Sequence, residues 1–127
     1  MKTTHTVAFA MLAGIAIGAT AMQGLHAQAK LKAYSVTEFE TIDAAAQATY
    51  TPLIVAALKA AGARNFNTAG GRTVALVGAP PKRVAINEWD SLEQAQAFFN
   101  SAAFKNLEPQ RDKAQKQIRN YTVEATN

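Results

Sequence analysis

The sequence predicts an α+β domain of the ferredoxin-like type, an antiparallel sheet with its helices on one face. The first observation is the order of the elements, which reads β-α-β-β-α-β along residues 30–127. The second is the spacing of the apolar residues, which changes between the period of a strand and the period of a helix. The third is the absence of cysteine, because a domain of this size without disulfides depends on packing for its stability.

The first strand and the first helix follow each other directly. Residues 32–40 are rich in β-branched and aromatic side chains, which predicts a strand. Asp43 is suited to cap the helix that follows, and Gly62 is suited to end it. Pro52 lies inside this helical pattern, so we expect either a kink there or a second helix capped by Thr51.

The second strand is expected in two pieces. Residues 63–69 and 72–77 have extended patterns, and Gly70-Gly71 between them indicates a bend or a bulge. Residues 78–81 then form a turn with little conformational freedom, because they end in two prolines. Residues 83–89 give the clearest strand pattern in the chain.

The second helical region begins with a capping motif. Ser91 and Gln94 have the spacing of a capping box, in which each side chain bonds a free backbone amide of the other. Ser101 is suited to restart a helix after the first segment ends. The helical pattern continues past Pro109, and residues 118–125 alternate like a final strand.

The predicted strands carry apolar side chains on both faces, although the helices cover only one. Two apolar faces both need cover, so we expect a second copy of the chain to close a dimeric barrel. One face is expected to carry Tyr34, Val36, Val74, Leu76, Val84 and Ile86. The other face is expected to carry Ala33, Phe39, Ala85, Trp89, Tyr121 and Val123.

The N-terminal residues have the order of a secretory signal: a short basic start, an apolar run and a polar end. The apolar run covers residues 7–21, which is shorter than the ~20 residues of a spanning helix. Cleavage fits after Ala27 or after Ala29. We therefore predict a signal peptide at residues 1–27, one domain at 30–127, and no membrane association after cleavage. The leader resembles a bacterial one, which implies the periplasm or secretion.

Several classes of chemistry are excluded by composition. Both histidines, His5 and His26, lie in the predicted leader, so the mature chain would lack histidine as well as cysteine. A Ser-His-Asp or Cys-His site, a structural zinc site and a haem ligand are then missing. We expect neither a metal nor a cofactor. The net charge of +4 is scattered, with no basic run longer than Lys82-Arg83, which argues against nucleic acid as a partner.

Four residues are candidates for a ligand site in a pocket between the sheet and the helices. Glu88 ends an apolar strand and is a candidate general base, although an ion pair with Arg111 or Lys82 is the favoured explanation of its position. The guanidinium of Arg111 could clamp a carboxylate on the ligand. Tyr34 and Trp89 combine an aromatic ring with a polar tip, and their alternative role is core packing.

An ordered set of short motifs carries a family resemblance. The motifs are Gly70-Gly71, Pro81-Lys82-Arg83-Val84-x-Ile86-x-Glu88-Trp89-x-Ser91, Ala95-x-x-Phe98-Phe99-Asn100-Ser101 and Pro109-x-Arg111. At these spacings the chain resembles a bacterial family known as domain of unknown function thirteen-thirty, within the dimeric α+β barrel superfamily. The likeness covers about residues 33–125. It implies the fold and the homodimer but no activity, since fold alone does not fix function.

The chain departs from the family pattern at two places. The usual Gly-Gly-Arg after the first helix is here Gly62-Ala63-Arg64, and the usual Ser-Pro-Glu-Tyr is Ser101-Ala102-Ala103-Phe104. The second change removes a carboxylate and a phenol, so a role that rests on them is not implied for this chain. Relatives in the superfamily include cofactor-free monooxygenases, isomerases, and haem-handling and chlorite-degrading enzymes.

The function predicted from the sequence is the binding of a small, largely apolar or anionic molecule by an exported homodimer. One alternative is an envelope protein whose apolar faces serve assembly alone, which predicts a closed core. Another is an enzyme resembling the cofactor-free monooxygenases or isomerases, with Glu88 as the base and Arg111 orienting the substrate. A further alternative, binding to an anionic surface, requires the scattered cations to gather on one face.

Overall fold

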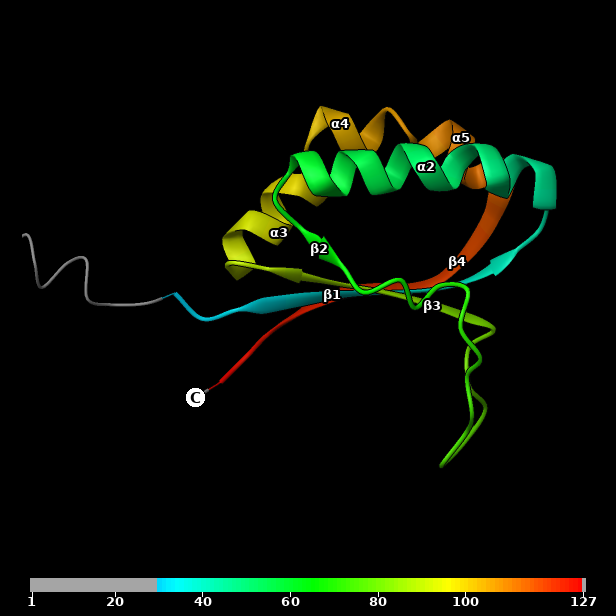
Figure 1. Cartoon of the computed structure of the whole chain (residues 1–127), viewed down its shortest axis with the longest axis horizontal. Coiled ribbons are helices and arrows are strands. Elements are labelled where there is room, and N and C mark those ends of the chain that lie inside the picture. Colours follow the sequence, from blue (N-terminus) through cyan, green and yellow to red (C-terminus); the bar gives the residue numbers. More distant parts are fainter. Residues whose placement is uncertain (1–29, 127) are drawn as a thin grey trace, which may run out of the picture. The chain divides into compact units, whose positions relative to one another are not determined.

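The computed structural model describes residues 30–126, so the predicted signal peptide and both of its cleavage positions lie outside the described residues. Figure 1 shows the strands as one sheet with the helices along one side. The described elements are β1 (Ala33–Thr41), α2 (Ala44–Ala60), β2 (Arg64–Asn65), β3 (Arg83–Trp89), α3 (Leu92–Phe99), α4 (Ala102–Lys105), α5 (Glu108–Ala114) and β4 (Gln115–Glu124).

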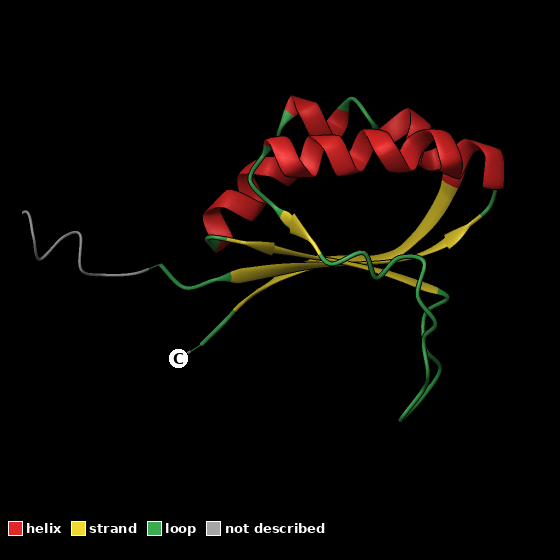
Figure 2. Cartoon of the chain, viewed as in Figure 1, coloured by secondary structure: helices red, strands yellow, loops and turns green. Residues whose placement is uncertain are grey.

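The topology of the sheet confirms the ferredoxin-like α+β fold. The strands lie in the order β2-β3-β1-β4, and every neighbouring pair is antiparallel. The first strand of the chain is therefore central, with Ala33 opposite Trp89 on one side and Glu124 on the other. The helices α2 to α5 cover the same face of this sheet, as the red and yellow layers of Figure 2 show.

The ends of α2 confirm the predicted caps, but Pro52 does not divide the helix. Asp43 accepts a hydrogen bond from the Ala46 amide at 2.8 Å, and Gly62 has a φ of 90°, which favours glycine. One helix runs through Pro52, so the alternative of a second helix capped by Thr51 is wrong. A proline removes one amide donor, and the tertiary packing of the helix outweighs that loss.

The caps of the second helical region are confirmed with one change. The Gln94 amide donates to Ser91 Oγ at 3.2 Å, and the Phe104 amide donates to Ser101 Oγ at 3.3 Å. The return bond of the capping box goes one residue earlier than expected, because Gln94 Oε1 accepts from the Asp90 amide at 3.0 Å. The Nε2 of the same glutamine donates to the Ala61 carbonyl at the end of α2, which ties the two helical regions together.

The last helix is shorter than the sequence pattern predicts, and the last strand is longer. Pro109 falls in the first turn of α5, where its missing amide is tolerated. The strand β4 begins at Gln115, which pairs with Thr41 at the end of β1. The Ala114 carbonyl accepts from the Ile42 amide at 2.9 Å, so sheet pairing starts where the helical pattern was expected to continue.

The predicted strand at residues 72–77 is wrong. The ladder with β3 stops near Phe66, whose amide donates to the Ile86 carbonyl at 3.1 Å. Thr68 Oγ1 then takes the place of backbone groups, donating to the Val84 carbonyl and accepting from the Ile86 amide. Beyond it the chain leaves the sheet on the side opposite the helices and returns at β3 (Figure 1). We call its uncharged part, residues 73–81, the arm.

The face assigned to the end of β4 is also wrong. Tyr121 lies opposite Val36 and Val123 opposite Tyr34, so both point to the face without helices, which we call the open face. The reason is a bulge, because the register moves from Arg119 to Gln117 between consecutive residues of β1. One extra residue inverts the alternation along the rest of a strand.

The core lies between the sheet and the helices. Trp89 is 1% exposed, and its indole nitrogen donates to Ser35 Oγ at 3.0 Å. Its ring centroid is 5.4 Å from that of Phe98. The buried cluster consists of Ala33, Leu58, Trp89, Ala95, Phe98 and Phe104. Because this cluster ties β1 and β3 to α2, α3 and α4, it fixes the height of the helix layer above the sheet.

Candidate functional site

A cavity of about 90 Å³ lies between α2 and the covered face of the sheet. Strands β1, β2, β3 and β4 form its floor, and α2 together with α3 and α4 forms its roof and wall. The apolar part of its lining is Phe39, Ile54, Val55, Leu58, Ala69, Ala85, Phe99 and Phe104. The polar part is Thr37, Gln47, Tyr50, Thr51, Asn65, Asn87, Gln115 and Gln117.

The polar lining of this cavity is neutral. Among the described residues, no Asp, Glu, Lys or Arg lines it. Asn65 Nδ2 donates to Asn87 Oδ1 at 2.8 Å, and Asn87 Nδ2 in turn approaches Ser35 Oγ at 3.3 Å. Transferring a carboxylate into such a site without a cationic partner is unfavourable. The site therefore suits a neutral polar group, and it does not favour the anionic ligand included in the sequence prediction.

Two residues of α2 supply further hydrogen-bonding groups to the cavity. Gln47 Nε2 donates to Thr51 Oγ1 at 3.0 Å, while Gln47 Oε1 is buried without a hydrogen-bond partner among residues 30–126. Tyr50 is 3% exposed, and burial raises the pKa of its phenol to about 12, with Arg111 lowering it and Asp112 raising it. The phenol is therefore a neutral donor and acceptor at physiological pH.

The structure brings together two of the four predicted site residues, on the open face. Tyr34 Oη donates to Glu88 Oε2 at 3.3 Å, from the neighbouring strand. Glu88 also pairs with Arg64 at 2.9 Å and with Lys32 at 3.7 Å. Glu88 therefore does form ion pairs. Its partners are Arg64 of β2 and Lys32, the residue before β1, and not Arg111 or Lys82 as predicted.

The other two predicted site residues lie elsewhere. Trp89 is in the core, on the covered side of the sheet. Arg111 lies in α5, where its Nε donates to Asp112 at 2.9 Å and its Nη1 lies 3.9 Å from Glu108. Its guanidinium carbon is 5.9 Å from the ring centroid of Phe104. The expectation that these residues surround one pocket with Glu88 is therefore wrong. Trp89 follows Glu88 in a strand and so points to the opposite face, and Arg111 is held in the helix layer by Glu108 and Asp112.

The cavity-lining amides were missed by the sequence argument, although one of them carried a signal. Asn87 shares a face of β3 with Ala85 and Trp89, so an amide stands between two residues that point into the core. A polar side chain at such a position must be hydrogen-bonded and is commonly part of a site. Asn65, Gln115 and the other amides gave no such signal, because they stand in polar stretches of the sequence.

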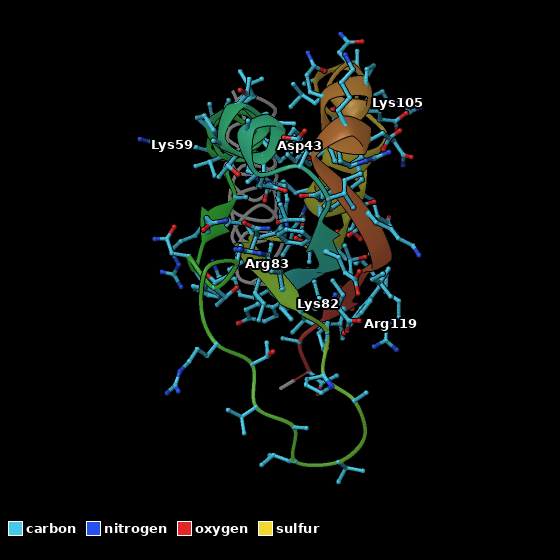
Figure 3. The ribbon with its side chains drawn as sticks, turned by 90° about the vertical axis from the view of Figure 1, so that its right-hand side faces the viewer. Asp43, Lys59, Lys82, Arg83, Lys105 and Arg119 are labelled. Carbon is cyan, nitrogen blue, oxygen red and sulfur yellow. The ribbon has the colours of Figure 1, made fainter. Side chains whose placement is uncertain are left out.

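The labelled cations of residues 30–126 are spread over different parts of the domain. Figure 3 shows Lys59 and Lys105 on opposite sides of the helix layer and Arg119 at the level of the sheet. Lys82 is paired with Glu40 at 3.6 Å. Among the described residues, no three Asp, Glu or His side chains are grouped to hold a metal ion, and no helix is long and apolar enough to cross a membrane.

The topology defines the class of the protein, a ferredoxin-like α+β fold with a four-stranded antiparallel sheet. It is similar to the RPA0582 protein of unknown function from Rhodopseudomonas palustris, with a TM-score of 0.60 and 13% identity over 85% of this chain and 92% of that chain. The methylated form of RPA0582 gives a TM-score of 0.58 at 13% identity over 85% and 90%. Likenesses at this identity concern the fold alone.

A more distant similarity exists to SnoaB, a cofactor-independent oxygenase from Streptomyces nogalater. Its TM-score is 0.47 at 11% identity, over 76% of this chain and 95% of that chain, so it carries no argument about chemistry. Residues 32–125 match the model of DUF1330, a domain of unknown function, and the chain belongs to this family. This confirms the resemblance drawn from the motifs. No curated protein matches the chain.

Proposed function

We propose that the protein binds a small neutral molecule in the cavity beneath α2. The observation that carries this proposal is a lining that combines an apolar wall with amides and hydroxyls but no charged group among the described residues. Such a combination is typical of small-molecule sites, where burial supplies affinity and a few polar groups fix orientation. The ligand class is a compact apolar body with one amide, hydroxyl or carbonyl group.

The polar groups of the cavity define how such a ligand would be held. Gln47 Oε1 is an acceptor without a donor in the described part of the chain, so an N–H or O–H of the ligand would satisfy it. The phenol of Tyr50 can donate to a ligand carbonyl or accept from its hydroxyl. A cavity with free hydrogen-bonding capacity favours ligand binding over the alternative of a closed core that serves assembly alone.

The test uses two small probes of the same shape and different charge, isobutyramide and isobutyrate. We expect isobutyramide to shift the side-chain amide NMR signals of Asn87 and Gln47 to saturation, while isobutyrate leaves them unchanged. Ala85→Leu fills the cavity and is expected to abolish the shifts. Val84→Leu is the matched control, because Val84 points to the open face and should leave binding intact. Equal binding of both probes, or binding that survives Ala85→Leu, would contradict the proposal.

The open face supports a second part of the proposal, that the protein acts as a homodimer. Tyr121 and Val123 are 46% and 50% exposed there, beside Val36 and Ile86 of the central strands. An apolar sheet face of this kind is stabilised by a second layer, and a copy of the same chain can supply it. Light scattering coupled to size-exclusion chromatography measures the mass, and a monomer at every concentration would contradict this part.

Export to the periplasm or beyond is also proposed, on the leader-like order of residues 1–27. Expression of the full chain in a bacterial host, followed by cell fractionation, tests the location. N-terminal sequencing of the product then distinguishes a start at Gln28 from a start at Lys30. A full-length protein retained in the cytoplasm would contradict export.

A further inference from the structure

The arm, residues 73–81, is the most exposed apolar segment among the described residues. Val74 is 77% exposed, and Leu76 and Val77 are each 96% exposed. The arm contains no charged residue, and its bounding positions are Arg72 and Lys82. Apolar side chains that are exposed to solvent next to one another mark an interaction site.

The base of the arm is held by specific contacts. Thr73 Oγ1 donates to the Pro81 carbonyl at 2.9 Å, which joins the two ends of the arm. Arg83 Nη1 donates to the Ala69 carbonyl at 3.2 Å, and Lys82 pairs with Glu40 on β1 at 3.6 Å. The arm therefore extends from a fixed base, with its apolar residues away from the rest of the chain.

The direction of the arm connects it with the open face. Figures 1 and 2 show the arm on the side of the sheet opposite the helices. The open face looks to the same side, with Tyr121 and Val123 exposed on it. One partner placed against the open face would therefore also contact the arm.

We propose that two copies of the chain exchange their arms, so that the arm of each copy packs on β4 of the other. The inference rests on the proposed homodimer and adds a second contact to it. The proposed dimer has its two-fold axis parallel to the strands and between the two sheets, an arrangement in which unlike edges meet. With the order β2-β3-β1-β4, the arm leaves beside the β2 edge and thus lies opposite the β4 edge of the other copy.

The contact surface on β4 matches the arm in chemistry. Ile118 and Tyr121 are 47% and 46% exposed on the part of this edge strand nearest the level of Arg83, where the arm returns to the sheet. Val74, Leu76 and Val77 of the other copy offer an uncharged apolar surface. Burying both removes apolar area from water at two equivalent places in the dimer.

A second copy accounts for the arm better than a lipid surface does. An apolar loop that enters a membrane is helped by cations at its base that attract anionic lipids. Of the three cations at the base of the arm, Arg72, Lys82 and Arg83, Lys82 is paired with Glu40. A second copy would also cover Tyr121 and Val123, whereas a loop that inserts in a membrane leaves the open face uncovered.

The first experiment compares dimer dissociation in an arm variant and a control. Leu76→Ser with Val77→Ser changes two side chains that are exposed in the single chain, so the fold is unaffected. We expect the dissociation constant, measured by sedimentation velocity, to rise about 100-fold. Leu53→Ser on α2, where the side chain is 41% exposed, is the control and should leave the constant unchanged.

The second experiment identifies the contact directly, because the chain has no cysteine and a single introduced thiol is unique. Leu76→Cys is labelled with a benzophenone maleimide, and labelled protein is mixed with an ¹⁵N-labelled copy before irradiation. We expect cross-linked peptides that join the arm of one copy to residues 115–124 of the other. Lys59→Cys on α2 is the control and should give no cross-link between copies.

The possible outcomes separate this inference from the proposed function. Cross-links confined to one copy, or a dimeric wild type whose dissociation constant the arm variant does not change, overturn the arm exchange alone. A wild-type chain that is monomeric at every concentration overturns both the arm exchange and the homodimer. Sedimentation with phosphatidylglycerol vesicles, lost in the arm variant while its dimer is unchanged, overturns the exchange in favour of a membrane contact.

Discussion

The two faces of the sheet divide the chemistry of this protein between them. The covered face holds neutral amides and aromatic residues around a cavity, with Asn87 and Trp89 buried. The open face carries the ion pairs, in which Glu38 is bonded to Arg119 and Glu88 to Arg64. Successive residues of each strand point alternately to the two faces. A shift of the pairing register by one residue would therefore move a side chain from the cavity to the proposed interface.

This division explains why the predicted site did not assemble. Glu88 and Trp89 are neighbours in the sequence and therefore point to opposite faces. A carboxylate on the open face can be neutralised by partners that remain near water, as Lys32 and Arg64 do. On the covered face, the same charge would need a buried partner, and neutral amides avoid that requirement.

The largest expected loss of stability comes from a substitution on the covered face. Trp89→Ala removes the centre of the core cluster and the bond to Ser35, so we expect unfolding to become easier by about 3–5 kcal/mol. Val123→Ala on the open face should cost less than about 1 kcal/mol when measured at concentrations where the chain is monomeric. Urea denaturation measures both. Similar losses at the two positions would contradict the difference between the faces.

A smaller effect is expected from the more buried ion pair of the open face. Glu38 is 7% exposed, and its Oε2 accepts from Arg119 Nε at 2.7 Å and Nη2 at 2.6 Å. Glu38→Gln should reduce the free energy of unfolding by about 1.5–3 kcal/mol, the usual range for a hydrogen bond to a charged group. Glu40→Gln, next to Lys82 at 3.6 Å, is the matched control and should change it by less than about 0.5 kcal/mol. Equal losses of stability in the two variants would argue against the role of burial.

The ion pair between Arg64 and Glu88 tests the same role of burial, because the side chain of Arg64 is exposed. Its side chain is 68% exposed, although it lies 2.9 Å from Glu88. Arg64→Ala is expected to cost less than about 1 kcal/mol, and the loss should diminish in high salt. Thermal denaturation at low and high ionic strength measures this. A loss as large as that of Glu38→Gln would show that Glu88 depends on this one cation.

The smallest effect at neutral pH comes from the covered face. The pKa of Tyr50 is raised to about 12 by burial, above its ordinary value of 10.0. The unfolded chain therefore releases this proton first, and stability should be unaffected below about pH 10 and fall as the pH rises from there to about 12. Tyr50→Phe should remove this part of the decline. Denaturation at a series of alkaline pH values measures it, and an unchanged pH profile in the variant would contradict the assignment.

Local chemistry made much of the fold predictable. Asp43, Ser91 and Ser101 cap helices within three residues of themselves, and Gly62 ends α2 by its own conformational freedom. The order of elements follows from the same local signals. The resulting βαββαβ order then leaves few ways to arrange the sheet, which is why the topology was also confirmed.

The failures concern groups that meet across the sheet. Residues 72–77 have the composition of a strand, but Thr68 replaces the backbone partners that would continue the ladder. The partner of Glu88 depends on which residue of β2 lies opposite it, and this is Arg64. The cavity depends on amides such as Gln117, whose position follows from the bulge. None of these is encoded within a few residues of sequence.

The bulge in β4 gives this strand one residue more than its pairing with β1 requires. Deleting Ile118, the residue that it accommodates, would leave Gln117 opposite Phe39 and Arg119 opposite Glu38, now in regular alternation. Gln117 would still face the cavity, and Tyr121 and Val123 would still face away from the helices. Homologous chains that lack this one residue can therefore keep both surfaces, because the bulge disappears together with the residue that causes it.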